Sequence, residues 1–461
     1  MLPKVVRNVF TVGGLTAFSR VLGLVREMLQ SRLIGAGIEQ SAFTLAFALP
    51  NMARKLFGEG ALTAAFVPVF KGEVERGEVE SARRLARAVI TLVMLILGSA
   101  VVLVLVGLSV WQDLRPETGD GTLTRTELTV KLVKILFPYV IFICGAAFGM
   151  GVLNALGRFV EGAFMPAFLN IVWIAALAAL CFFPGLAVST RIQVVSLAIL
   201  LGGMAQMAFL FRCMRKRGLS GLISLRGLRG SWRDEKFRLV WQNTALAAVG
   251  AGAVQVNYLL DQVLGQCAAP WAAGVIGYAE RLMDLPLGVV GVAFGTVLLP
   301  TFSGHFAKGD AAGAGACLKK SLLQMTALML PASVVTFFCA PWIVWLIYEG
   351  NAFDATATVR VARALSVYGL GLCFFAAQKC LIPFFQAQGD MKTPLRVSAE
   401  TVVLNAVLNV LAVVFLPVEW RHVGLAGSTS LCSLVGCLLF LRALRAFPPC
   451  FPLAFRAENV V

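Results

Sequence analysis

The feature that most constrains this chain is a succession of apolar stretches, each long enough to cross a lipid bilayer. A transmembrane helix needs about 20 predominantly apolar residues, because the hydrocarbon core of a bilayer is about 30 Å thick. Of the 461 residues, 59% are hydrophobic and 14% are charged, whereas a soluble domain carries about 25% charged residues. This composition excludes a soluble globular enzyme, a disordered chain and a secreted disulfide scaffold, and it indicates an all-α polytopic membrane protein.

Twelve spans are predicted, and the charges of the connecting loops orient them. Loops rich in Lys and Arg alternate with loops that are poor in them, which is typical of a multi-pass chain with both termini in the cytoplasm. These loops and basic residues inside the bundle account for the formal charge of +16, so nucleic acid is not an expected partner. The predicted spans are residues 8–33, 41–70, 86–111, 128–155, 163–184, 192–212, 238–264, 273–302, 318–347, 360–387, 394–417 and 423–444.

Two pairs of similar segments indicate an internal duplication. Residues 65–70 (AFVPVF) resemble residues 297–302 (VLLPTF), and residues 154–158 (NALGR) resemble residues 386–390 (QAQGD), with an offset of 232 residues in both pairs. A shift of half the chain predicts two pseudo-symmetric six-helix lobes around a central cavity, as in transporters built from parallel repeats. The alternative is chance similarity between apolar segments. The predicted domains are an N-terminal lobe (1–217), a basic cytoplasmic linker (218–236) and a C-terminal lobe (237–461).

Four arginines lie inside predicted spans, where a charge costs about 2.5–3.5 kcal/mol on insertion scales. Arg20 and Arg26 are six residues apart, about 9 Å along a helix, so both can reach into one wide cavity. Glu27 is expected to point away from Arg26 and to pair with another helix. Arg54 and Arg281 bring further guanidinium groups to membrane depth. Because arginine binds phosphate bidentately and keeps its charge, this set predicts a cationic cavity for a phosphate-bearing amphiphile.

Other charged residues accompany these arginines. Lys55 and Glu59 are an i, i+4 pair that can neutralise each other, which leaves Arg54 as the more available cation. Glu280 and Asp284 share one helix face, and Asp284 can pair with the arginine between them. The alternative interpretation is that all of these charges form structural ion pairs or snorkel towards the helix ends.

A second polar cluster is predicted from Asp261 in the seventh span and Asn405 and Asn409 in the eleventh. The two asparagines are at i, i+4, so their amides share a helix face. One carboxylate with amide oxygens can hold a hard monovalent cation such as Na⁺, which is the single cofactor the sequence suggests. The alternative is hydrogen bonding between helices.

The motifs that carry these residues resemble those of the MviN/MurJ family. The first span carries Ser19-Arg20, Gly23 and Arg26-Glu27. The second span carries AFALPN (46–51), RKLFGEGA (54–61) and AFVP (65–68), and the eighth carries AERLMDLP (279–286). The resemblance extends from the N-terminus to about the twelfth span. The motif of the second span is the specific one, because the first-span motif alone is short.

This resemblance implies a lipid II flippase of the multidrug/oligosaccharidyl-lipid/polysaccharide exporter superfamily. Such proteins move the undecaprenyl-pyrophosphate-linked peptidoglycan precursor across the bacterial inner membrane by alternating access. Lipid II, membrane lipids and cell-wall synthesis proteins are then the expected partners. The family's cavity arginines fall on Arg20, Arg26, Arg54 and Arg281, its acidic partners on Glu59 and Glu280, and its sodium site on Asp261, Asn405 and Asn409, with Ser428 or Thr429 as hydroxyl ligands.

The chain departs from the family pattern at several positions. Glu27 and Asn409 each stand where family members often have Asp, and Ser41 replaces a frequent acidic residue. Asn409 lowers the negative charge available to a cation. Twelve spans are predicted against the fourteen of most members, so we expect other helices to handle the long prenyl chain.

Three rival functions were weighed. An exporter of another polyprenyl-linked glycan, or a multidrug/cation antiporter of the same superfamily, would share the fold, but clustered arginines suit anions better than cationic drugs. A membrane enzyme acting on polyprenyl pyrophosphate would need clustered carboxylates or a His/Ser constellation, and the sequence suggests neither. A scaffold would have no use for buried charges. We therefore predict a transporter that is not an enzyme.

Overall fold

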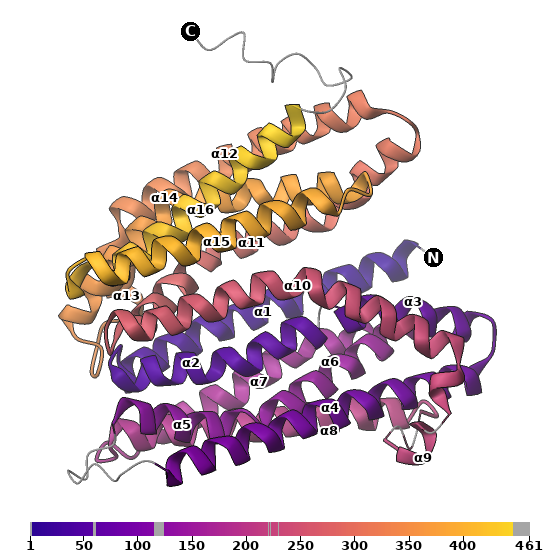
Figure 1. Cartoon of the computed structure of the whole chain (residues 1–461), viewed down its shortest axis with the longest axis horizontal. Helices are drawn as coiled ribbons and strands as arrows, with labels where there is room; N and C mark the ends of the chain where they lie inside the picture. The colour runs from indigo at the N-terminus through magenta and orange to yellow at the C-terminus, as the bar shows by residue number, and fades with distance from the viewer. Residues whose placement is uncertain are drawn as a thin grey trace. The chain divides into compact units, whose positions relative to one another are not determined.

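The computed structural model describes residues 2–58, 61–114, 124–219, 221, 223–228 and 230–445, and every regular element within these ranges is a helix (Figure 1). Apolar residues dominate nearly all of these segments, and a backbone in lipid must satisfy its own hydrogen bonds, which a helix does. The helices are α1 (Leu2–Ile34), α2 (Ile38–Ala53), η1 (Arg54–Gly58), α3 (Ala61–Glu75), α4 (Val79–Asp113), α5 (Arg125–Leu136), α6 (Tyr139–Ala155), α7 (Phe159–Leu180), α8 (Val188–Arg215), α9 (Leu225–Leu228), η2 (Ser231–Arg233), α10 (Glu235–Ala268), α11 (Ala272–Ala307), α12 (Ala311–Phe338), α13 (Ala340–Tyr348), α14 (Ala355–Ala387), α15 (Lys392–Phe415) and α16 (Val418–Arg445).

The predicted helical spans are confirmed among the described residues. Nine of them coincide with single helices, and the other three coincide with consecutive helices: α2, η1 and α3; α5 and α6; α12 and α13. By length and hydropathy eight segments qualify as membrane spans, namely α4, α5 with α6, α7, α8, α12, α14, α15 and α16. The other four predicted spans are α1, the α2–α3 segment, α10 and α11, which carry the predicted charged site residues, whereas the predicted Asn405 and Asn409 lie on α15.

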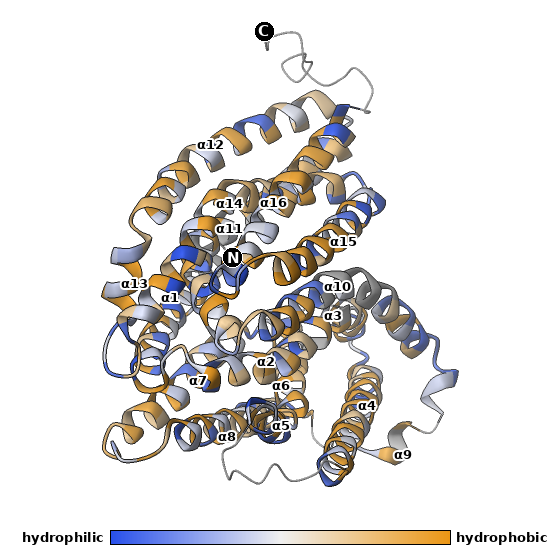
Figure 2. Cartoon of the chain, turned by 60° about the vertical axis from the view of Figure 1, so that its left-hand side comes forward, coloured by the Kyte–Doolittle hydropathy of each residue, from blue (hydrophilic) through white to orange (hydrophobic). Residues whose placement is uncertain are grey.

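Along some individual helices, apolar residues occupy most of the length and hydrophilic residues lie towards the ends. Figure 2 shows α4 and α15 coloured as hydrophobic over most of their length, with hydrophilic residues towards their ends. Their exposed side chains include Val102, Leu103 and Val106 on α4 and Val403, Val407 and Val414 on α15. Exposed apolar side chains along a whole helix are expected where the solvent is lipid.

The chain forms two compact units. Unit 1 comprises Met1–Leu259 with Gly350–Phe353, and unit 2 comprises Leu260–Glu349 with Asp354–Val461. The division falls inside α10, whereas the predicted N-terminal lobe ends at residue 217. The lobe boundaries therefore stay a prediction.

Small residues allow close helix packing in each unit. In unit 1, a Cβ on Gly203 of α8 would lie 2.4 Å from the ring of Tyr139, so only glycine fits there. In unit 2, α14 packs against α11, α12, α13 and α16. A Cβ on Gly369 of α14 would lie 3.0 Å from the Phe337 backbone nitrogen of α12. Close approach through small residues is the usual way in which membrane helices associate.

Helix ends repeat at the offset predicted from the sequence. Gly157 and Gly389 both have positive φ angles, of 73° and 79°, and each follows a helix that ends in the same pattern of hydrogen bonds. The amide of Arg158 donates to Leu153, and the amide of Asp390 donates to Phe385. This is the Schellman pattern, in which glycine adopts the left-handed conformation after the helix.

A second pair of helix ends has the same relation. Gly77 and Gly309 have φ angles of 80° and 70°, and the following amides, of Glu78 and Asp310, donate to carbonyls five residues earlier. The partners again lie 232 residues apart. Two matched helix ends at one offset support an internal duplication over chance similarity.

An ion pair fixes the start of α10 to the α3–α4 hairpin in unit 1. The Glu73 side chain is 3% exposed and accepts hydrogen bonds from Lys236 Nζ and Ser81 Oγ, both at 2.5 Å. The hydrogen bond from Lys236, followed by that from Ser81, holds the pKa of the Glu73 carboxyl below its usual value despite burial. The same hydrogen bond raises the pKa of the Lys236 ammonium. The last residue of the predicted basic linker (218–236) is thus held in place by its ion pair with Glu73.

Candidate functional site

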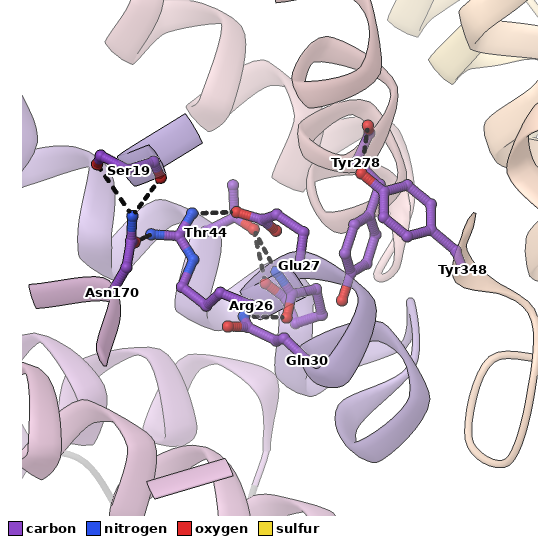
Figure 3. A network of polar contacts seen from close by, with 9 residues as sticks. Ser19, Arg26, Glu27, Gln30, Thr44, Asn170, Tyr278 and Tyr348 are labelled. Carbon is purple, nitrogen blue, oxygen red and sulfur yellow. Dashed lines mark hydrogen bonds and ion pairs between the residues drawn. The ribbon is translucent and has the colours of Figure 1, made fainter. Parts of the chain in front are cut away.

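Arg26 of α1 lies at the centre of a polar cluster in unit 1 (Figure 3). Its Nη1 donates to Asn170 Oδ1 of α7 at 2.8 Å, and its Nη2 forms an ion pair with Glu27. The guanidinium carbon lies 4.4 Å from the ring centroid of Trp173, one turn further along α7. The side chains of Arg26 and Glu27 are 14% and 13% exposed. A cation at this depth is thus neutralised by one carboxylate and held by two neutral groups.

The expectation that Glu27 points away from Arg26 was wrong, because the two side chains form an ion pair. Neighbouring residues on a helix point about 100° apart and do not face each other. The long arginine side chain can reach around the helix, however, when a facing helix draws its guanidinium to one side. Asn170 and Trp173 supply that attraction. The sequence signal for them is an asparagine and a tryptophan three residues apart in an otherwise apolar span, outside the motifs described above.

Asn170 is itself held by the backbone of α1. Its Nδ2 donates to the Ser19 carbonyl at 2.9 Å and to Ser19 Oγ at 3.5 Å, as Figure 3 shows. Asn170 and Ser19 are 7% and 9% exposed. With its amide nitrogen committed to Ser19, the Asn170 oxygen is left facing Arg26. The amide therefore acts as a fixed acceptor for the guanidinium.

A cavity of about 550 Å³ adjoins this cluster in unit 1, between α1, α3, α6 and α7. Arg20 is the charged residue in its lining, and the polar residues Thr16, Ser19, Thr63 and Asn154 line it as well. The remaining walls are apolar. Ser19 connects the two features, because it lines the cavity and accepts a hydrogen bond from Asn170. An arginine, hydroxyl groups and apolar walls suit an amphiphile with an anionic group.

The cavity exists because facing positions carry small residues. Ala147 and Gly151 of α6 and Gly162 and Ala163 of α7 all line it. A Cβ on Gly151 would only just contact Thr63 and Val67, at 3.5 and 3.4 Å. Larger side chains here would fill the volume. The sequence indicated Arg20 and a cationic cavity but not these lining residues, since the small residues come from separate parts of the chain.

Arg54 and Lys55 lie in η1, a single π-helical turn. Such turns are often found at functional sites. Arg54 donates from Nε and Nη2 to Asn51 Oδ1, at 3.3 and 3.1 Å. Lys55 Nζ lies 5.1 Å from the ring centroid of Tyr258. The predicted pair of Lys55 with Glu59 lies outside the described residues, because Glu59 is not among them.

The predicted charges of α11 lie in unit 2. Arg281 and Asp284 are exposed, whereas Glu280 is half-buried. The hydroxyl of Tyr368 on α14 donates to Glu280 Oε1 at 3.5 Å, and Tyr368 is buried. Sequence reasoning missed Tyr368, which has no motif around it. That the arginines of both halves share one cavity stays a prediction.

Asp261, Asn405 and Asn409 come together in unit 2. The Asp261 Oδ1 accepts hydrogen bonds from Asn405 Nδ2 at 2.7 Å and from Asn409 Nδ2 at 2.6 Å. Ser428 Oγ donates to Asn409 Oδ1, while Thr429 donates to a backbone carbonyl of its own helix. Both asparagines are buried. The predicted grouping therefore exists as a network of hydrogen bonds between α10, α15 and α16.

This donor set fits a cation after one change. As the amides stand, their nitrogens face the carboxylate, whereas a sodium ion binds oxygen. Rotation of both amides by 180° would present their oxygens beside Asp261 without moving the backbone. Among the described residues there is no group of three or more His, Cys, Asp or Glu that could hold a metal ion. Na⁺ at Asp261 thus stays a prediction.

The chain matches known proteins over nearly its whole length. The family model described as lipid II flippase MurJ matches residues 30–453. A probable lipid II flippase MurJ of Rhizobium tropici is 35% identical over 410 residues, covering 88% of this chain and 75% of that protein. The lipid II flippase MurJ of Burkholderia cenocepacia is 32% identical over 446 residues, covering 95% and 83%.

Solved structures share the fold. A lipid II flippase MurJ in an inward closed conformation matches with a TM-score of 0.78 and 23% identity, over 95% of this chain and 88% of that one. An inward-facing MATE family multidrug resistance transporter of the MOP superfamily matches with a TM-score of 0.69 and 15% identity, over 93% and 95%. The family model and the sequence identity together show that this multi-pass membrane chain belongs to the lipid II flippase MurJ family.

Proposed function

We propose that the chain moves lipid II from the cytoplasmic to the outer leaflet of the bacterial inner membrane by alternating access, with both termini in the cytoplasm. Family membership supports this substrate. The observation in the molecule that carries the proposal is the Arg26 cluster beside the Arg20 cavity in unit 1. Ser19 is common to the surroundings of the two guanidinium groups, because it accepts a hydrogen bond from the Asn170 that holds Arg26 and lines the cavity together with Arg20. These two guanidinium groups at membrane depth can receive the diphosphate of a lipid-linked precursor.

The chemistry favours a diphosphate over other head groups. Arginine presents a planar fork of donors that matches phosphate oxygens, and it stays charged at any physiological pH. The apolar walls of the cavity suit the parts of the substrate next to the diphosphate. The prenyl chain remains in lipid, so the protein has only to carry the polar portion across.

Sodium binding at Asp261 is part of the same proposal. The network of Asp261 with Asn405 and Asn409 provides one negative charge and two amides that can turn. A bound cation would change the contacts of three helices at once. Such a change would bias one conformation of unit 2 over another, and a sodium gradient across the membrane would supply the energy for net transport.

The alternative function is export of another polyprenyl-linked glycan. Such a substrate carries the same diphosphate, so the Arg26 cluster alone does not separate the two. A multidrug antiporter is disfavoured, because cationic drugs would be repelled by Arg20 and Arg26. The likeness to MATE transporters at 15% identity shows the fold alone.

Complementation of a flippase-depleted bacterium tests the proposal. We expect Arg26→Ala and Arg281→Ala to fail, while the unmodified chain restores growth and the leaflet accessibility of labelled lipid II. Arg396→Ala is the matched control, since Arg396 is 81% exposed and pairs only with Glu400 on the surface of α15 in the contacts described. Expression and monodispersity must be equal in all three. Normal growth of Arg26→Ala would overturn the assigned role, and restored growth without lipid II movement would favour the other glycan.

A further inference from the structure

The partners of Arg26 are of two kinds. Asn170 and Trp173 are neutral and lie on α7, which faces α1. Glu27 is charged and follows Arg26 directly in the sequence. The neutral partners can hold the guanidinium in position but cannot compensate its charge. Glu27 compensates the charge, although helix geometry does not place it next to Arg26.

The α7 partners are fixed by their own surroundings. The amide of Asn170 is oriented by two hydrogen bonds to Ser19. The ring of Trp173 is 3% exposed and packs edge-on against Phe43 and Phe47, with centroids 5.7 and 5.5 Å away. The guanidinium therefore sits against a rigid platform. Movement of Arg26 away from this platform would break two contacts, the hydrogen bond to Asn170 and the packing on the Trp173 ring.

The ion pair of Arg26 with Glu27 is easier for another anion to replace than the contacts with Asn170 and Trp173. Both side chains of the pair keep about an eighth of their surface exposed, 14% and 13%, so an incoming anion can reach the outer side of the guanidinium. The Nε of Arg26 is buried and has no hydrogen-bond partner among the described residues, so the ion pair with Glu27 leaves one guanidinium donor unsatisfied. Replacement of a carboxylate by a phosphate oxygen keeps the local charge balanced, which matters because an uncompensated buried charge is costly.

We propose that Glu27 is an internal counterion that occupies Arg26 when no substrate is bound and that the substrate's diphosphate displaces it. Asn170 and Trp173 are positioning residues, which hold the guanidinium in the same place in both states. The inference rests on the proposed function for its ligand class. It adds that affinity is set by competition, so that Glu27 can recapture Arg26 and help to release the diphosphate after translocation.

Binding of farnesyl diphosphate to the full chain in lipid nanodiscs tests the competition. We expect Glu27→Gln to bind this probe about tenfold more tightly, a factor that corresponds to about 1.4 kcal/mol, because the competing carboxylate is gone. Glu27→Asp shortens the reach of the carboxylate and should give an intermediate affinity. In an Arg26→Ala background, Glu27→Gln should have no effect. Glu161→Gln, which removes a carboxylate paired with Arg158 on the same unit, is the matched control.

Substitution of Asn170 tests the positioning role. Asn170→Ala removes the fixed acceptor, so the probe should bind more weakly. Asn170→Asp preserves size and acceptor but adds a second carboxylate beside the guanidinium. We therefore expect Asn170→Asp to bind more weakly than Asn170→Ala. Aspartate also places an oxygen against the Ser19 carbonyl to which the Asn170 amide donates, so the free energy of unfolding of both variants is measured beside binding. A purely structural asparagine would lose affinity only in proportion to lost stability.

The outcomes separate the inference from the proposed function. If Glu27→Gln and Glu27→Asp bind no more tightly than the unmodified chain, Glu27 is not a competitor and the inference fails while the function stands. The Asp variant alone decides this point if the Gln variant does not fold. If Asn170→Asp binds better than Asn170→Ala, the positioning role fails. If the unmodified chain does not bind the probe and does not restore growth, the proposed function fails and the inference fails with it.

Discussion

The Asp261 network allows a quantitative prediction about stability. Substitution of Asn409 by alanine removes the hydrogen bond from Asn409 Nδ2 to Asp261, which is 2.6 Å long. A hydrogen bond to a charged group contributes about 1.5–3 kcal/mol, and one between neutral groups about 0.5–1.5 kcal/mol. The Ser428 hydroxyl, which also donates to Asn409, keeps the Leu425 carbonyl at 2.8 Å as an acceptor. The substitution should therefore cost about 2 kcal/mol.

The charge of Asp261 causes about half of this loss. In an Asp261→Asn background the Asn409→Ala substitution breaks only a neutral hydrogen bond, so its cost should fall to about 1 kcal/mol. Reversible unfolding in mixed micelles containing sodium dodecyl sulfate measures both costs in a double-mutant cycle. The coupling of about 1 kcal/mol exceeds the 0.3–0.5 kcal/mol within which distant substitutions add.

Two further variants serve as controls for the double-mutant cycle. Asn405→Ala should couple to Asp261→Asn in the same way, because Asn405 donates to the same oxygen at 2.7 Å. Thr429→Ala should show no coupling, since Thr429 donates to a carbonyl within its helix. Strict additivity of Asn409→Ala and Asp261→Asn would refute the carboxylate–amide network as described.

Three further predictions follow from other parts of the molecule. Lys236→Gln should increase hydrogen exchange in the first turn of α10 between pH 6 and 9, because the ion pair with Glu73 is lost. The pKa of the Glu73 carboxyl is lowered from its usual 4.5. The difference in exchange from the unmodified chain should therefore persist near neutrality and vanish only as the pH falls well below 4.5. Gly203→Ala should lower the free energy of unfolding by about 1–3 kcal/mol through a clash with the Tyr139 ring, whereas Gly98→Ala, with open space around it, should not; equal stabilities would contradict the close packing. Sodium chloride should stabilise the unmodified chain relative to choline chloride, by about 2.7 kcal/mol at a hundredfold excess over the dissociation constant, and Asp261→Asn should abolish the difference; an unchanged sodium effect in that variant would place the ion elsewhere.

Much of the architecture was predictable, because lipid imposes simple rules on sequence. The length of each apolar stretch is set by bilayer thickness, so eight of the twelve predicted spans qualify from length and hydropathy alone among the described residues. The 232-residue offset was visible in short motifs. The matched ends of α6 and α14, which are followed by Gly157 and Gly389, support the same offset. The breaks between α5 and α6 and between α12 and α13 were not predicted, because local backbone changes leave hydropathy almost unaltered.

The residues of the candidate site were only partly predictable. The i, i+4 spacing of Asn405 and Asn409 was enough to place both amides on one face, and both bond to Asp261. The partners of Arg26 could not be inferred in this way. Asn170 lies 144 residues further along the chain, and no spacing rule relates positions on separate helices.

The sequence by itself determined that the chain spans a membrane and where its helices run, since both depend on local composition, and it predicted which charges lie at membrane depth. Only the tertiary structure decided how those charges are compensated. Arg26 is held by Asn170 and Trp173 and paired with Glu27 because α1 and α7 pack together. The cavity beside Arg20 likewise exists because small residues of α6 and α7 meet around it. Packing between distant helices sets these distances, and electrostatic energy depends on distance rather than on sequence separation.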